Sequence, residues 1–373
     1  MPANHTSAAA TVKNSVRPVL LVDHDTVNEC TSSLRHLMVG LTDDSCPTAL
    51  VCPLDVDADS LVCPTIEVIR HPLFKMPLLK SQNIKAVLGS IIKFKPTILH
   101  CCSDSKARLT KYLSHQLNLP YVLTFDSIRR HLFAPFVSSD HCGALIASSG
   151  VIAEHVKQTH HRLAERVTRI NIGVFVEDVC ACFSDKARVT SMVVAQPLDN
   201  PSDFEPLLNA VKHLAVDGCE LVLVITGTGP AERKLHEMIK ALGLSQIVTT
   251  VGDIQPVRAV FAGADIFIVP RPGHRFNSRL LEAMSVGMAV AACRGGVDDL
   301  LIDDQTAVLF EPDDELGIYS SLQKLLDKRE FARQIAQAAQ SHVRVHHSVS
   351  KMVASLIQTY HTAQAWYKES SNG

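Results

Sequence analysis

The segment DIFIVPRPGHRFNSRLLEAMSVGMAVAACRGG, residues 265–296, carries the clearest structural pattern in the chain. Its first apolar run ends at Pro270, a polar loop follows, and helical spacing of apolar residues begins at Ser278. A second apolar run occupies residues 288–293 and is followed by Arg294, Gly295 and Gly296. Apolar runs that alternate with helices are typical of a parallel sheet with helices on both faces.

The same alternation extends in both directions from this segment. In the first half the apolar runs are PVLLV (18–22), PTALVC (47–52), TILHCC (97–102), YVLTF (121–125) and ALIAS (144–148). In the second half they are SMVVA (191–195), ELVLVIT (220–226), IVTTVG (247–252) and, after the segment above, AVLF (307–310). We predict an α/β protein with two facing, doubly wound, Rossmann-like parallel-sheet domains.

The length of the chain, 373 residues, exceeds what one hydrophobic core usually holds and supports two domains. The linker is placed where Gly173, Cys180 and Cys182 interrupt both the strand and the helix period. We therefore predict a disordered tail at residues 1–17, a first domain at 18–173, a linker at 174–188, a second domain at 189–345, and a C-terminal helix and tail at 346–373.

Composition excludes several classes of protein. The net charge of −2, from 36 basic and 38 acidic residues, disfavours nucleic acid as a partner. No apolar run reaches the roughly 18 residues of a transmembrane helix, so we predict no membrane span. The small basic excess up to Gly173 leaves contact with a membrane surface open. Eleven cysteines without a C-x-x-C pair indicate reduced thiols and a cytoplasmic protein.

The turn before Ser278 has the features of an anion site. In a doubly wound sheet, ligands bind beyond the carboxyl ends of the strands. A helix that begins with Asn277 or Ser278 as cap presents free backbone N–H groups and the positive end of its dipole there, which suits a diphosphate. Glu282 is expected on the side of this helix that faces the cleft, and Gly295 and Gly296 let the backbone approach a ligand closely.

A family resemblance rests on these motifs. The run from Gly227-Thr-Gly-Pro through VGDI, AGADIFIVP, LLEAMSVGMAV and RGGVDDLLIDDQTAVLFEPDD resembles the donor half of GT-B glycosyltransferases of the family-4 type, over about Val189 to Leu326. The first half is similar, more loosely, to their acceptor domain. The resemblance implies GT-B architecture and retaining transfer of a hexosyl group from a nucleoside diphosphate sugar to a glycan, lipid or small-molecule acceptor. The sugar nucleotide is then a co-substrate, and no further cofactor is expected.

The resemblance also implies roles for individual residues. Glu282 matches the second glutamate of the family motif, which is expected to bind the ribose hydroxyls. Gly295 and Gly296 match the turn near the sugar and phosphate, and Gly252 matches the turn near the base.

Other positions depart from the family pattern. The first motif glutamate falls on His274, and a histidine of the first domain falls on Asp126, so these two residues are our catalytic candidates. The arginine and lysine that usually hold the diphosphate fall near Gln196 and Ser202. Because a diphosphate needs positive partners, we expect cations of the loop after residue 270 to replace them. We expect Arg271 and Arg275 to do so, while Arg279 lies one turn into the helix. The alternative is that these arginines pair with surface acids such as Asp298 or Asp299 and touch no ligand.

Polar residues also follow the strands of the first domain. Asp23, Asp25 and His100 stand with Asp126 at predicted carboxyl ends, where they could orient an acceptor hydroxyl. The alternative is that short acidic residues simply favour such turns. Paired carboxylates alone make a poor Mg²⁺ site, so we predict no metal. A second reading of the whole chain stays open, in which a catalytically inactive GT-B protein binds nucleotide, glycan or a protein partner.

Overall fold

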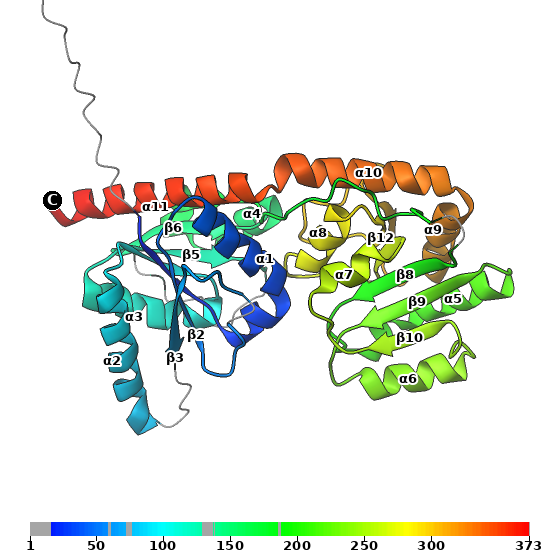
Figure 1. Ribbon diagram of the computed structural model, residues 1–373, viewed down its shortest axis with the longest axis horizontal. Helices are drawn as coiled ribbons and strands as arrows, with labels where there is room; N and C mark the ends of the chain where they lie inside the picture. The colour runs from blue at the N-terminus through cyan, green and yellow to red at the C-terminus, as the bar shows by residue number, and fades with distance from the viewer. Residues whose placement is uncertain are drawn as a thin grey trace, which may run out of the picture.

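The structure is a computed structural model, which describes residues 16–58, 61–71, 77–128, 137, 139–185 and 188–372. Most of the predicted tail, residues 1–15, and residues 186–187 of the predicted linker lie outside the described residues. The described chain forms two parallel sheets with helices on both faces, so the predicted fold class is confirmed (Figure 1).

The first sheet has seven parallel strands in the order β3-β2-β1-β4-β5-β6-β7. β1, β2, β4, β5 and β6 are buried and coincide with the predicted apolar runs, whereas the partly exposed edge strands β3 and β7 were not predicted. Its elements are β1 (Pro18–Leu21), α1 (His24–Asp43), β2 (Ala49–Pro53), β3 (Glu67–His71), α2 (Pro77–Phe94), β4 (Ile98–Cys101), α3 (Ala107–Leu117), β5 (Tyr121–Phe125), β6 (Cys142–Ala147), α4 (Gly150–Thr159) and β7 (Val167–Arg169).

The second sheet has six parallel strands in the order β10-β9-β8-β11-β12-β13, the order of a Rossmann fold. The order reverses at β8, between β9 and β11, which marks the place where ligands bind in such sheets. The elements are β8 (Thr190–Ala195), α5 (Glu205–Val216), β9 (Leu221–Thr226), α6 (Glu232–Ala241), β10 (Val248–Val251), α7 (Val257–Ala262), β11 (Ile266–Val269), α8 (Ser278–Ser285), β12 (Ala289–Cys293), β13 (Val308–Phe310), α9 (Glu315–Asp327), α10 (Arg329–His346) and α11 (Val349–Asn372).

The last two helices connect the domains along one side of the molecule. α10 packs on the second domain, and α11 returns to cover the first domain beside α1 and β6 (Figure 1). The fit of α11 on the first sheet is close, because a Cβ at Gly143 of β6 would lie 2.5 Å from the Cβ of Ala363. The chain therefore ends on the domain in which it began.

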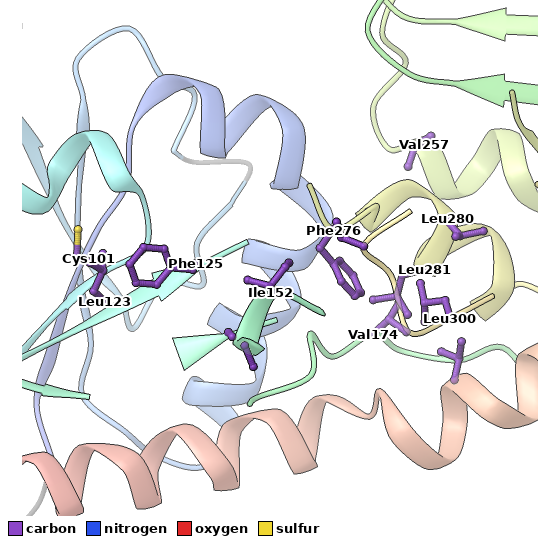
Figure 2. Packing of buried hydrophobic residues seen from close by; sticks show 14 of the residues in the cluster. Cys101, Leu123, Phe125, Ile152, Val174, Val257, Phe276, Leu280, Leu281 and Leu300 are labelled. Carbon is purple, nitrogen blue, oxygen red and sulfur yellow. The ribbon is translucent and has the colours of Figure 1, made fainter. Parts of the chain in front are cut away.

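One apolar cluster runs through both domains. It contains Leu123 and Phe125 of the first sheet as well as Leu280 and Leu281 of α8. Phe276, 3% exposed, lies between these groups (Figure 2). This packing fixes the loop before α8 against the carboxyl edge of the first sheet.

Candidate functional site

A cleft of about 410 Å³ lies between the carboxyl ends of the two sheets. One wall is formed by the end of β8 and by the loop and first turn that join β11 to α8. The opposite wall includes Glu29 and Cys30 of α1. The residues of the loop and first turn that line it are Val269, Arg271, Pro272, Gly273, His274, Arg275, Phe276, Asn277, Ser278 and Arg279.

Asn277 is the cap of α8. Its side-chain oxygen accepts a hydrogen bond from the backbone N–H of Leu280 at 2.9 Å. The backbone N–H of Asn277 itself donates to Asp298 at 2.7 Å. Burial raises the pKa of Asp298 to about 7, although this hydrogen bond opposes the shift. Ser278 donates to the backbone oxygen of Glu29 at 2.9 Å and so ties α8 to α1.

The loop before α8 also pairs with the segment after β5. Phe276 N–H donates to the backbone oxygen of Asp126 at 2.7 Å, and Ile128 N–H donates to that of His274 at 2.8 Å. These bonds bring the two catalytic candidates, Asp126 and His274, to the same junction of the domains. The His274 side chain is exposed at the cleft.

Arg271 and Arg275 both line the cleft, but each already forms ion pairs with carboxylates. Arg271 forms ion pairs with Asp313 and, at 3.8 Å, with Asp203. Arg275 pairs with Glu29 and, at 3.6 Å, with Asp126. Burial would lower the pKa of Arg275, but these two carboxylates raise it. A diphosphate at these arginines would have to compete with acids that the sequence analysis did not assign to them.

Arg279 differs from the other two cleft arginines. Its Nη2 donates to Asp253 at 2.8 Å, and its side chain is 15% exposed. Its Nη1 is buried and has no hydrogen-bond partner in the described part of the chain. A buried donor without an acceptor is costly, so this nitrogen favours a ligand oxygen.

The role predicted for Glu282 stays a prediction, because its side chain is buried and borders a small space next to the cleft. Glu282 is 2% exposed and does not line the 410 Å³ cleft. Its Oε2 accepts from Arg258 of α7 at 3.0 Å, and its Oε1 lies 3.5 Å from Nδ1 of His36 in α1. Helix α8 is buried on nearly all sides because α1, α7 and α10 pack around it. The spacing of apolar residues in α8 therefore does not show which side of the helix faces the core and which side faces a ligand.

Glu282 borders a separate, narrow cavity of about 10 Å³, which Arg279 also lines. This volume holds about one water molecule. Burial raises the pKa of Glu282 to about 7, although Arg258 opposes the shift. Burial and Arg258 lower the pKa of His36 to about 4, so this ring is neutral at pH 7. A ribose ring does not fit in a space of this size.

Gly252, Gly295 and Gly296 do not line the cleft, although a Cβ at Gly295 would lie 3.7 Å from Pro272 in its wall. Gly295 has φ of +95°, a conformation that favours glycine. A Cβ at Gly296 would lie 3.5 Å from Asp298, an ordinary contact, and a Cβ at Gly252 would meet no atom within 4 Å. The backbone oxygen of Gly252 accepts a hydrogen bond from Thr226 at 2.9 Å.

The polar residues of the first domain are mostly structural. The carboxylate of Asp23 caps α1 by accepting from Thr26 N–H at 2.8 Å and also accepts from Ser103 and Ser105. Burial would raise the pKa of Asp23, but these hydrogen bonds lower it to about 2. Asp25 is exposed in the first turn of α1. The turn preference of short acidic residues thus accounts for both, and their predicted acceptor role is not supported by this geometry.

His100 is also unsuited to proton transfer. It is 2% exposed, and its two ring nitrogens are hydrogen-bonded to Tyr360 and Thr124, both at 2.7 Å. Burial lowers its pKa to about 3. Of the four predicted acceptor-side residues, only Asp126 lies beside the cleft residues.

Replacing Asp23 with alanine is expected to lower the free energy of unfolding by about 1–2 kcal/mol at pH 7, because α1 loses its cap. The folded pKa of about 2 lies below the ordinary 3.8, so this carboxylate stabilises the fold above about pH 3.8 and stops doing so as the pH falls through 2. Urea unfolding should therefore show a smaller difference in the free energy of unfolding between the wild type and Asp23→Ala at pH 3 than at pH 7. Asp25→Ala, in the same turn, is the control, and an equal loss in both variants would contradict the capping role.

The described residues contain no group of three His, Cys, Asp or Glu side chains placed to hold a metal ion, and the absence of a metal stays a prediction. None of the helices described is long and apolar enough to span a bilayer.

The residues that the sequence analysis missed are Glu29, His36, Asp253 and Arg258. Each contacts a candidate residue of α8 or its preceding loop. Asp253 stands in the VGDI motif of the family resemblance, and the other three stand in no recognisable local motif. For the acidic partners, a further signal was the excess of cations near residue 275, which required acids somewhere in the fold.

Comparisons with known proteins support the fold and the resemblance to glycosyltransferases. Residues 190–328 match the family model described as glycosyl transferases group 1. The sulfoquinovosyl transferase SQD2 of Arabidopsis thaliana is 24% identical over 335 residues, which cover 82% of this chain and 62% of that protein. The D-inositol 3-phosphate glycosyltransferase of Salinispora tropica is 28% identical over 231 residues, 54% of this chain and 47% of that protein. The chain thus spans less than two thirds of either relative.

Solved structures show the same architecture over almost the whole chain. A glycosyltransferase from Rickettsia africae superposes with a TM-score of 0.77 at 15% identity and covers 94% of this chain and 99% of its own. Anabaena Alr3699/HepE, in complex with UDP and glucose, gives a TM-score of 0.75 at 15% identity over 92% of this chain and 99% of its own. The chain therefore has the GT-B fold, and residues 190–328 of its second domain match the glycosyl transferases group 1 model.

Proposed function

We propose that this protein is a glycosyltransferase that moves a hexosyl group from a nucleoside diphosphate sugar to a glycan, lipid or small-molecule acceptor, with retention of anomeric configuration. The observation that carries the proposal is the cleft of about 410 Å³ between the carboxyl ends of the two sheets, with the start of α8 in its wall. Ligands of doubly wound sheets bind at this edge, and a helix amino terminus favours phosphate.

The relatives support this choice of reaction. Sulfoquinovosyl transferase and D-inositol 3-phosphate glycosyltransferase are named for sugar transfer. The Anabaena protein of the same fold was solved with UDP-glucose as well as with UDP. The comparisons do not support the alternative of a protein that has lost catalysis. The cysteines are all free, which supports a further proposal of a reducing, cytoplasmic location.

The chemistry assigned to the cleft is mainly electrostatic. Departure of a nucleoside diphosphate leaves negative charge, which fixed N–H groups and cations stabilise without covalent bonding to the protein. Arg279 supplies the cation whose Nη1 is buried and unpartnered among the described residues. His274 and Asp126 lie where the two domains meet, which suits contact with the transferred sugar and the acceptor hydroxyl.

Incubation with UDP-glucose tests the proposal. We expect saturable binding of UDP and slow release of UDP and glucose in the absence of an acceptor, because a complete donor site transfers some sugar to water. Rapid NMR should detect α-glucose first, as retention requires. Rates should be the same with and without a chelator, since phosphate is neutralised by protein groups. Absence of both UDP binding and hydrolysis would count against the function, and turnover restored only by Mg²⁺ would contradict metal independence.

A further inference from the structure

A second cavity, of about 90 Å³, lies inside the first domain. It is a partly open pocket lined by α1, by the carboxyl ends of β4, β5 and β6, and by α11. Apolar side chains form much of its wall, including Leu34 of α1, Ile146 of β6, Ile170 after β7, and Met352 and Leu356 of α11. The described contacts assign this space no occupant.

The cavity favours an uncharged, apolar group. His100, the ring in its wall, uses both nitrogens in hydrogen bonds to Tyr360 and Thr124. Ser148, at the end of β6, directs its hydroxyl to the backbone oxygen of Phe125 at 3.4 Å. By proportion to the roughly 150 Å³ apolar cavity that binds benzene, this space accepts a group of about four carbon atoms.

The cavity adjoins the proposed catalytic cleft. Cys30 lines both spaces, and Asp126 lines the cavity while its partner Arg275 lines the cleft, with 3.6 Å between their charged atoms. Helix α1 is interrupted at Cys30, where φ is −120° and ψ is 23°. The break in the helix thus falls at the junction of the two spaces, where a bound molecule would extend from one into the other.

We propose that this cavity receives the apolar end of the acceptor, so that the acceptor is an amphiphile with a short or branched alkyl group next to its hydroxyl-bearing part. The inference rests on the proposed glycosyl transfer. Asp126, at the junction, orients such a molecule. The apolar end of the acceptor then lies among Leu34, Ile146 and Ile170, while the hydroxyls of the acceptor face the cleft. A fully polar acceptor would leave this apolar wall without a partner.

A series of alkyl β-D-glucosides, from methyl to hexyl, tests the inference by NMR titration in the presence of UDP. Each methylene up to butyl is expected to tighten binding about fourfold, because it is removed from water. Hexyl glucoside should bind no more tightly than butyl glucoside, because the cavity is then full.

Two variants in the cavity wall should change the longest alkyl chain that gains affinity, in opposite directions. Ser33→Leu on α1 fills space and should make ethyl glucoside the longest ligand that gains affinity. Leu34→Ala, at the next position, adds space and should extend the gain to hexyl glucoside. Opposite shifts cannot both result from partial unfolding. Cooperative thermal unfolding and unchanged UDP affinity show that each variant is folded.

The outcomes separate this inference from the proposed function. If UDP binds but the affinity for glucosides does not depend on alkyl chain length, the proposed role of the cavity is overturned and the proposed function stands. The same holds if UDP binds but neither variant changes the longest alkyl chain that gains affinity. A chain-length limit that both variants move, without UDP binding, would support the cavity as an apolar site and count against glycosyl transfer.

Discussion

Replacing Arg258 with alanine is expected to lower the free energy of unfolding by about 3 kcal/mol at pH 8, because it strands a buried carboxylate. Arg258 donates to Glu282 at 3.0 Å, to Ser285 at 3.2 Å and to Glu177 at 2.8 Å. Its own side chain is 24% exposed, whereas that of Glu282 is 3% exposed. Loss of the guanidinium leaves the Glu282 charge beside His36, a ring that is neutral at this pH.

The effect of Arg258→Ala depends on pH. The pKa of Glu282, about 7, lies above the ordinary 4.5, so its contribution to stability is complete below about pH 4.5 and is lost as the pH rises through 7. Without Arg258 this pKa rises further, and the cost of the substitution should grow from pH 5 to pH 8. The contribution of His36 to the pH dependence of stability has the opposite sign, because the pKa of His36 is lowered to about 4. This contribution masks part of the pH dependence in the wild type.

Denaturant unfolding of a matched pair separates these contributions. Arg258→Ala combined with Glu282→Gln should be more stable than Arg258→Ala alone at pH 8, because the double variant buries no unpaired charge. The free energies of unfolding of the single and double variants should become equal at pH 5, where the Glu282 carboxyl is protonated. Equal stability of the single and double variants at pH 8 would show that Glu282 is not ionised in its buried position.

Replacing Arg279 with alanine is expected to weaken UDP binding by about 10- to 100-fold, while uridine binding changes little. A hydrogen bond to a charged group contributes about 1.5–3 kcal/mol, and a bond to phosphate is absent in uridine. Arg279 lies in the cleft wall, and its buried Nη1 has no hydrogen-bond partner among the described residues. Arg271 and Arg275 each meet two carboxylates instead.

Arg188 provides a matched control for Arg279. It also pairs with one aspartate, Asp265, at 3.0 Å, and its Nε is buried without a partner among the described residues. Asp265 precedes β11, so this pair lies at the amino edge of the second sheet, away from the cleft. Calorimetry should find wild-type UDP affinity in folded Arg188→Ala. Equal affinity of Arg279→Ala and the wild type would exclude Arg279 from the phosphate site.

Much of the architecture could be predicted from local patterns. The apolar runs gave both parallel sheets, and the polar loop before residue 278 gave the capped start of α8, with Asn277 as the cap. These features depend on neighbours within a few residues, so short-range periodicity and capping preferences suffice to predict them. The sequence also places His274 and Arg275 at a carboxyl edge, because a parallel sheet brings all its strand ends to one side.

Tertiary packing alone decided what the charged side chains contact. Helical period groups Arg279 with Glu282, but α7 and α1 pack against α8 and direct Glu282 to Arg258 and His36 while Arg279 turns to Asp253. Arg271 and Arg275 found acids on other elements for the same reason. Residue spacing specifies which side chains share a face of a helix. The partner of a buried charge, and hence its protonation and its access to a ligand, is set by elements distant in sequence that only the folded chain brings together.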